Sequence, residues 1–162
     1  AMDQIDRKII NMLEQNARAS LKELSAACYI SSPAIAARIA KLEKAGIITG
    51  YHASVNFEKL DYHVKAFIRI QLEPRQKGEF YPFVKTVPNI IECNCVTGDY
   101  SELMEVVFES TAALVNFINY LQSRFGKTST QIVFSTSVDH RGITFQNVDA
   151  FSADDLKDDA HH

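Results

Sequence analysis

The chain has 162 residues, a length that suits one ordinary domain or two small ones. Hydrophobic residues make up 46% and charged residues 23%, which allows a buried core and excludes disorder over most of the chain. No apolar run approaches the roughly 20 residues that cross a bilayer, and the polar start lacks the apolar stretch of a signal peptide. We therefore expect a cytoplasmic protein with no membrane contact.

Charge is distributed unevenly along the chain, although the formal net charge is only −3. Residues 1–60 carry eight Lys and Arg against six Asp and Glu, whereas the remainder carries nine against fourteen. An acidic partner such as nucleic acid would therefore bind at the N-terminal end. A solvated surface without a partner is the alternative explanation of this modest asymmetry.

Two helices are predicted before residue 30. The first spans residues 3–16, where Asp3 can cap the helix and four apolar residues recur on one face. The second starts at Ser20, because Ser20 and Glu23 have the spacing of a capping box. The apolar residues of the two helices are Ile5, Ile9, Met12, Leu13, Leu21, Leu24 and Cys28.

A third helix follows after a very tight turn. Ser31 or Ser32 can cap it, Pro33 suits its first position, and Gly46 supplies a left-handed end. Its apolar stripe consists of Ile35, Ile39 and Leu42. A helix, a tight turn and a capped helix form the layout in which the second helix of the pair enters the major groove of DNA.

The outward face of this third helix favours DNA binding over the alternative of a plain three-helix scaffold. Its side chains are either cationic or small. We expect no carboxylate on this face, because Glu43 should lie nearer the buried side. Alanines offer no donors to base edges, so we expect Arg38, Lys41 and Lys44 to contact phosphates and sequence preference to come largely from DNA shape. The predicted DNA-binding residues are Ser32, Pro33, Ala34, Ala37, Arg38, Lys41 and Lys44.

The second half alternates strands and helices. Strands are predicted at residues 64–72, 90–97, 102–108 and 132–138, with the middle two forming a hairpin. A helix that carries Phe80, Phe83, Val84 and Val87 ends at Pro88, and another spans residues 112–125. The resulting order of strand, helix, hairpin, helix and strand is a split β-α-β layout.

Three motifs in the first half carry a resemblance to a known family: Ile5–Ile10, Ser31–Ile39 and Leu42–Ile48. Together with Gly50–Tyr51 and Gly98–Tyr100, they resemble the Lrp/AsnC, or feast/famine, family of transcription regulators over about residues 3–140. The resemblance implies an α+β protein with a winged or plain helix-turn-helix and a ferredoxin-like β-α-β-β-α-β domain that dimerises and binds amino acids.

The resemblance also implies an effector site near the predicted hairpin, between dimers. The turn backbone would bind the effector's carboxylate and Asp99 its ammonium group. The candidate effector-binding residues are Thr97, Gly98, Asp99, Tyr100 and Ser101. This chain departs from the family at Ser101, where an acidic residue is usual, and at Tyr29 in the helical turn, where the family often has Gly.

The expected domains are a helix-turn-helix at residues 1–50, a connecting strand or hinge at 51–62 and an effector-binding (RAM-type) domain at 63–140. An acidic tail at 141–162 is expected to be mobile, although Phe145, Val148 and Phe151 could dock on a neighbouring subunit. One face of the sheet would expose a broad apolar patch on a monomer. We therefore expect a homodimer that assembles further into tetramers or octamers.

We expect no catalytic centre, cofactor or metal. The histidines are scattered, and Cys28, Cys93 and Cys95 form no C-x-x-C pair, so reduced core thiols are the favoured interpretation. The sequence thus predicts a regulator that binds double-stranded DNA under control of an amino acid or related metabolite. Two alternatives remain: a haem-pathway decarboxylase on the same scaffold, and an architectural DNA-binding protein without an effector.

Overall fold

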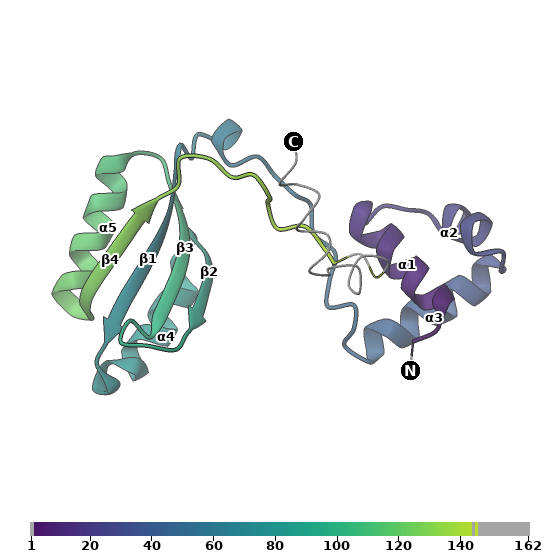
Figure 1. Ribbon diagram of the computed structural model, residues 1–162, viewed down its shortest axis with the longest axis horizontal. Coiled ribbons are helices and arrows are strands. Elements are labelled where there is room, and N and C mark those ends of the chain that lie inside the picture. Colours follow the sequence, from purple (N-terminus) through teal and green to yellow (C-terminus); the bar gives the residue numbers. More distant parts are fainter. Residues whose placement is uncertain (1, 144, 146–162) are drawn as a thin grey trace, which may run out of the picture. The chain divides into compact units, whose positions relative to one another are not determined.

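The structure is a computed structural model that describes residues 2–143 and residue 145. The chain forms two compact units (Figure 1). One contains residues 2–54 with the described residues from 138 onward, and the other contains residues 55–137. Of the expected acidic tail, residue 144 and residues 146–162 lie outside the described residues, Val148 and Phe151 among them.

The N-terminal unit contains the three expected helices, α1 (Gln4–Gln15), α2 (Leu21–Cys28) and α3 (Ser32–Lys44). Each begins at a side-chain cap: the Asp6 N–H donates to Asp3, the Glu23 N–H to Ser20 within a complete capping box, and the Ala34 N–H to Ser31. The buried core of this unit consists of Ile9, Leu24, Cys28 and Ile35. The apolar stripes predicted from the sequence therefore meet in one cluster.

The turn between α2 and α3 has a left-handed residue that is not glycine. Tyr29 has φ 58° and ψ 35°, and its N–H donates to the Ser25 carbonyl. A side chain in this region costs roughly 1–2 kcal/mol, so the departure from glycine noted in the sequence introduces backbone strain. The ring is 91% exposed, and the Lys8 ammonium lies 5.9 Å from its centroid.

The segment that follows α3 differs from the prediction. Residues 51–57 form no strand, and Glu58–Leu60 form a single 3-10 turn. Of the two predicted alternatives for residues 51–62, a connecting strand or a hinge, the strand is not formed, because no other strand pairs with this segment within the described residues. The hinge stays a prediction.

The second unit is a four-stranded antiparallel sheet with two helices over one face (Figure 1). Its strands are β1 (Val64–Leu72), β2 (Ile90–Cys95), β3 (Glu102–Phe108) and β4 (Gly126–Ile132), in the spatial order β2-β3-β1-β4. The helices are α4 (Lys77–Thr86), preceded by a 3-10 turn at Pro74–Gln76, and α5 (Thr111–Arg124). This order and the two-layer arrangement confirm the ferredoxin-like fold.

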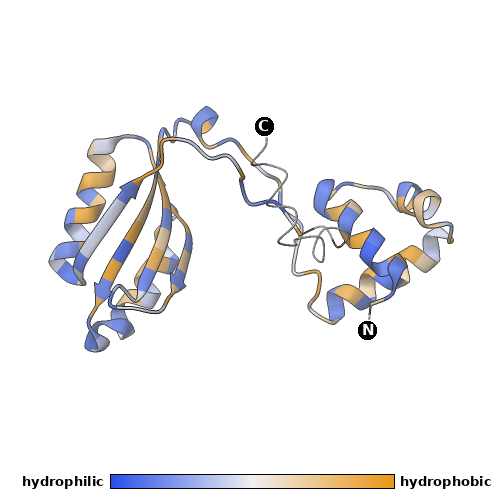
Figure 2. Ribbon diagram, viewed as in Figure 1, coloured by the Kyte–Doolittle hydropathy of each residue, from blue (hydrophilic) through white to orange (hydrophobic). Residues whose placement is uncertain are grey.

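The core of this unit lies between the sheet and the two helices. Residues coloured as hydrophobic recur along the strands and helices of this unit in Figure 2. Phe80 of α4 is fully buried, and its ring packs edge-on against Phe125 with centroids 5.3 Å apart. The buried residues are Ala66, Ile68, Ile70, Leu72, Phe80, Met104, Val106, Phe108, Leu114, Leu121 and Phe125.

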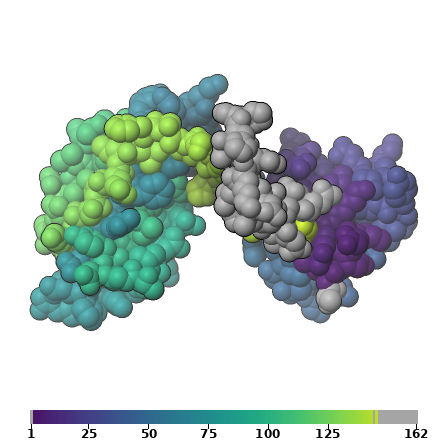
Figure 3. Space-filling model, in the orientation of Figure 1, coloured from purple at the N-terminus to yellow at the C-terminus, as the bar shows by residue number. Residues whose placement is uncertain are grey.

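The last strand was predicted six residues too late. β4 begins at Gly126, directly after α5, and pairs with β1 as far as the Ala66–Ile132 pair. Its sequence is mostly polar because it is an edge strand, so the apolar residues that follow it gave a misleading signal. Those residues lie at the surface, in yellow-green in Figure 3, and Phe134 is fully exposed. Gly126 has φ +144°, and a Cβ there would lie 2.4 Å from the Gln71 carbonyl oxygen.

The open face of the sheet is mixed rather than broadly apolar. Strand alternation places Phe67, Leu103 and Val107 on the face away from the helices. The same face carries the ion pair between Lys65 and Glu105, whose charged atoms lie 3.1 Å apart. The prediction of a broad apolar patch therefore holds for only part of this surface.

Candidate functional site

The outward face of α3 is exposed as the sequence predicts. Pro33, Ala37 and Ala40 are exposed, as are Lys41 and Lys44, whereas Ile35 and Leu42 are buried. Ser32 and Ala34 are half-buried in the first turn. Among the described residues, no carboxylate forms an ion pair with Lys41 or Lys44, so both ammonium groups are available to an external anion.

Glu43 departs from the expectation that it lies toward the buried side. It is exposed, and its carboxylate accepts a hydrogen bond of 3.2 Å from the Tyr51 hydroxyl. Partial burial of the phenol and this carboxylate raise the pKa of Tyr51 above its ordinary value. The only acidic side chain of α3 is thus held by the segment that follows the helix.

Arg38 has two carboxylate partners within its own unit, which the sequence did not predict. Its guanidinium lies 2.7 Å from the Asp3 carboxylate and 3.1 Å from the Asp6 carboxylate. These contacts join the start of α1 to the middle of α3, and the hydrogen bond from Arg38 lowers the pKa of Asp3. Arg38 therefore joins α3 to α1, and the predicted phosphate contacts of Arg38, Lys41 and Lys44 stay a prediction.

Replacing Arg38 by methionine is expected to return the pKa of Asp3 toward the ordinary value of about 4, because the main group that stabilises its charged form is removed. A lowered carboxyl pKa stabilises the fold above the ordinary pKa, and that stabilisation is lost as the pH falls through the lowered value. The thermal midpoint of the variant should therefore depend less on acid pH. NMR titration of the Asp3 carboxyl, with Lys22→Met as control, measures the shift; an unchanged pKa would contradict the assignment.

The candidate effector residues lie together in the turn between β2 and β3. Thr97, Gly98 and Asp99 are exposed, and Tyr100 and Ser101 are half-buried. Gly98 has φ +100°, and the Val96 N–H closes the turn on the Ser101 carbonyl at 2.7 Å. These residues therefore form the turn of the predicted hairpin. Their role in effector binding stays a prediction.

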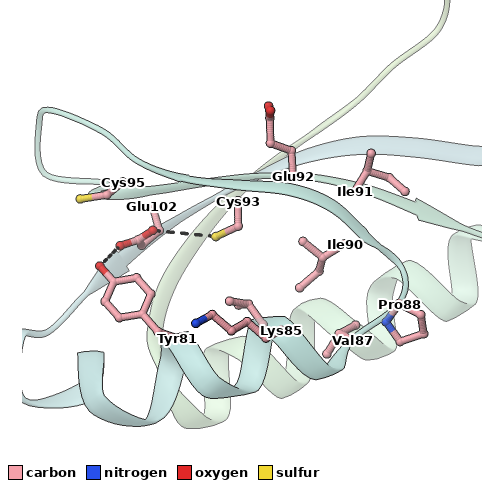
Figure 4. Close-up of a pocket in the computed structure, with 11 residues that line it drawn as sticks. Tyr81, Lys85, Val87, Pro88, Ile90, Ile91, Glu92, Cys93, Cys95 and Glu102 are labelled. Atoms are coloured by element: carbon pink, nitrogen blue, oxygen red, sulfur yellow. Dashed lines mark hydrogen bonds between the residues drawn. The ribbon is translucent and has the colours of Figure 1, made fainter. Parts of the chain in front are cut away.

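A pocket of about 430 Å³ lies between α4 and the edge strand β2, close to this turn (Figure 4). Sequence reasoning did not find it. It has an apolar wall and a polar end formed by a tyrosine, a glutamate and two cysteines. The lining residues are Tyr81, Val84, Lys85, Val87, Pro88, Ile90, Ile91, Glu92, Cys93, Cys95 and Glu102.

Glu102 is the unusual residue of this pocket because it is a carboxylate that is only 1% exposed. The Tyr81 hydroxyl donates to it at 2.7 Å, and the Cys93 thiol lies 3.9 Å from its other oxygen (Figure 4). The bond to Glu102 raises the pKa of Tyr81 to about 12. Burial, followed by the charge of Glu102, raises the pKa of Cys93 to about 11.

One sequence signal could have revealed Glu102. In β3 it occupies the position of the alternating series that continues with Met104, Val106 and Phe108, all of which face the helices. An acidic residue at such a position must be buried or must interrupt the strand.

Within the described residues, no group of three or more Cys, His, Asp or Glu side chains is arranged to hold a metal ion. None of the described helices combines the length and the apolar character that crossing a membrane requires.

Comparison with protein families gives two matches. Residues 2–49 match the winged helix-turn-helix DNA-binding family, and residues 65–143 match the Lrp/AsnC ligand-binding domain. Among curated proteins, the chain is 39% identical over 139 residues to the uncharacterized HTH-type transcriptional regulator YezC of Bacillus subtilis, covering 86% of this chain and 98% of that protein. It is 36% identical over 121 residues to the regulator LrpA of the same species, covering 74% of this chain and 89% of LrpA.

Solved structures agree with these matches. B. subtilis LrpC superposes with a TM-score of 0.81 at 30% identity, covering 87% of this chain and 99% of LrpC. The regulator NMB0573 of Neisseria meningitidis, solved as a complex with L-Met, has a TM-score of 0.81 at 26% identity, covering 87% and 94%. With a DNA-reading unit in front of a ferredoxin-like sheet, and relatives that align over nearly their whole length, this chain belongs to the Lrp/AsnC family of helix-turn-helix transcriptional regulators.

Proposed function

We propose that this regulator binds double-stranded DNA through the outward face of α3, with the first turn and small residues against the groove and with Lys41 and Lys44 on phosphates. The observation that carries the proposal is that this face is exposed and has two ammonium groups without ion-pair partners among the described residues. Ammonium groups on phosphates supply affinity without reading sequence. Because such a regulator acts on chromosomal DNA, we propose that it is located in the cytoplasm.

We further propose that an amino acid modulates assembly and DNA affinity. Support comes from the match to the Lrp/AsnC ligand-binding domain and from two solved neighbours, NMB0573 and the feast or famine regulatory protein Rv3291c of Mycobacterium tuberculosis, whose structures contain L-methionine. Such an effector acts only through unequal affinity for two states of the protein.

The assembly that we propose is a homodimer through the open face of the sheet, with tetramers or octamers built from it. Phe67 and Leu103 on that face are half-buried and keep apolar surface that a partner can cover, and the Lys65–Glu105 pair adds a polar contact. A two-fold dimer presents two copies of α3, which suits half-sites about one helical turn apart.

Fluorescence anisotropy of the full chain with promoter DNA, at several salt concentrations, tests the DNA-binding proposal. We expect the logarithm of the affinity to fall linearly with the logarithm of salt, with a slope near −0.9 for each phosphate neutralised. Addition of L-methionine should change the affinity. Binding that fails at low salt would refute the proposal.

Binding measurements on the same protein and DNA distinguish two alternative functions, a haem-pathway decarboxylase and an architectural DNA-binding protein. The matched curated proteins are transcriptional regulators, which favours regulation over the decarboxylase alternative. Binding of a tetrapyrrole without retention of DNA would reverse this preference. DNA affinity that is indifferent to every amino acid would favour an architectural role.

A further inference from the structure

We infer that the outward face of α3 binds the acidic segment of the same chain, residues 146–162, when no DNA is present, and that this segment competes with DNA for Lys41 and Lys44. The inference rests on the proposed DNA-binding function and adds a regulation of the same face. It is supported by the charge of the segment, by the place from which the segment starts, and by the cations on α3.

The segment has the charge of a competitor for phosphate. Among its 17 residues it has one lysine and five aspartates, which are Asp149, Asp154, Asp155, Asp158 and Asp159. Residues 2–54 have the opposite balance, with seven Lys and Arg against five Asp and Glu. Carboxylates bind the same ammonium groups as phosphate oxygens do, so the segment and DNA can use the same cations.

The segment starts on the same unit as α3. Phe145, the last described residue, is half-buried; its N–H donates to the Asn11 side chain at 3.4 Å, and the Arg7 guanidinium lies 5.6 Å from its ring centroid. Gly142 passes so close to the Glu14 carboxylate that a Cβ would not fit there. Arg7, Asn11 and Glu14 have the spacing of one helix face, so the chain before the segment lies along α1.

The segment is long enough to reach α3 from this point. The ion pairs of Arg38 with Asp3 and Asp6 join α3 to α1. The 17 residues span up to roughly 60 Å when fully extended, whereas a unit of about 60 residues has a radius of gyration of only about 10 Å. A tethered segment has an effective concentration on the order of millimolar at such a target, so weak contacts suffice for binding.

The face of α3 offers two cations to the segment. Lys41 and Lys44 lie one helical turn apart and are exposed, and neither has an ion-pair partner among the described residues. Glu43, the acidic residue between them, accepts a hydrogen bond of 3.2 Å from the Tyr51 hydroxyl. An acidic segment that pairs with both lysines therefore occupies the groups that we propose for phosphate contact.

Binding of the segment and binding of DNA exclude each other on this face. The segment therefore lowers the apparent affinity for every duplex, because phosphate contacts carry no sequence information. Salt weakens the contact of the segment with the lysines as well. The inhibition should be largest at low salt, which makes the measured dependence of DNA affinity on salt shallower than it would be without the segment.

A full chain in which the five aspartates of the segment are replaced by asparagine tests the inference. At low salt we expect it to bind a promoter duplex and a scrambled duplex about 10-fold more tightly for each bound subunit, with a steeper dependence on salt. Fluorescence anisotropy measures both quantities. No gain in affinity would overturn the inference.

A matched control carries the same change of net charge on the sheet unit. The corresponding amides replace five exposed acidic residues, Glu58, Asp61, Glu73, Glu92 and Glu109. Because this control leaves the segment intact, its DNA affinity should stay within about 2-fold of that of the parent chain. A gain as large as that of the segment variant would attribute the effect to net charge alone and would refute docking on α3.

Lysine variants distinguish docking from repulsion between the segment and DNA. In a Lys41→Gln, Lys44→Gln chain, neutralising the segment should raise DNA affinity by less than about 2-fold, because the cations that bind the segment are gone. In a Lys22→Gln chain the gain of about 10-fold should remain, since Lys22 belongs to α2. Equal gains in both chains would show that the segment only repels DNA, contrary to the inference.

Amide chemical shifts measured without DNA separate this inference from the proposed function. Neutralising the segment should shift the amides of Lys41 and Lys44 and leave that of Lys22 unchanged, and about 0.5 M salt should shift the same amides in the parent chain. Unchanged amides along α3 would overturn the inference and leave the DNA-binding proposal standing. DNA affinity that does not depend on Lys41 and Lys44 would instead overturn the proposed function, and the competition with it.

Discussion

Reversing the charges of Lys41 and Lys44 together is expected to weaken binding to every DNA duplex, by about 100-fold or more near physiological salt. Both side chains are exposed on α3, and neither has an ion-pair partner among the described residues. Because phosphates carry no sequence information, the loss should be the same for a preferred operator and a scrambled duplex. Anisotropy titrations on both duplexes measure it.

The salt dependence separates this mechanism from unfolding. The slope of log affinity against log salt should become shallower by about two units for each bound subunit, since two phosphate contacts are lost. Lys77→Glu with Lys127→Glu is the matched control, because these exposed lysines belong to the other unit. A loss confined to one DNA sequence, or an equal loss in the control, would count against α3 as the phosphate-binding element.

Replacing Phe80 by alanine should destabilise the C-terminal unit by roughly 3–5 kcal/mol. Phe80 is fully buried, and it packs against Phe125 and against the ring of Tyr81, with centroids 5.8 Å apart in the second pair. Truncation removes the apolar burial and leaves a cavity at the contact of α4 with the core. A domain of this size has a total stability only a few times larger, so the variant lies close to unfolding.

Urea denaturation followed by circular dichroism measures the effect, and amide exchange of β1 assigns it to the C-terminal unit. Phe134→Ala provides the same chemical change at a fully exposed position and should alter stability by less than about 0.5 kcal/mol. Equal effects of the two substitutions would show that Phe80 is not part of a tightly packed core.

The predictions that succeeded depended on local chemistry. The three N-terminal helices follow from capping residues and apolar stripes that the chain itself contains, and α3 ends within two residues of Gly46 as expected. β1 and β3 have the predicted bounds because their alternation is set by one buried face. The exposed set on α3 followed from the same periodicity.

The features that the sequence did not predict depend on partners distant in sequence. Arg38 lies 35 residues from Asp3, so its ion pair could not be read from the composition of α3. β4 is identified by pairing with β1 rather than by apolar residues. The Glu102 pocket required knowledge that α4 covers β2, which brings Tyr81 to a carboxylate 21 residues away.

The return of the chain to the helical unit after β4 has a topological consequence. The described residues from 138 onward belong to that unit, where the Phe145 N–H donates to Asn11 and the Arg7 guanidinium lies 5.6 Å from the Phe145 ring centroid. The sheet unit is consequently an insertion within the helical unit. Two segments of the backbone connect the units, one after residue 54 and one before residue 138. A change of conformation in the sheet unit can therefore reach the helical unit along the backbone from either end of the sheet unit.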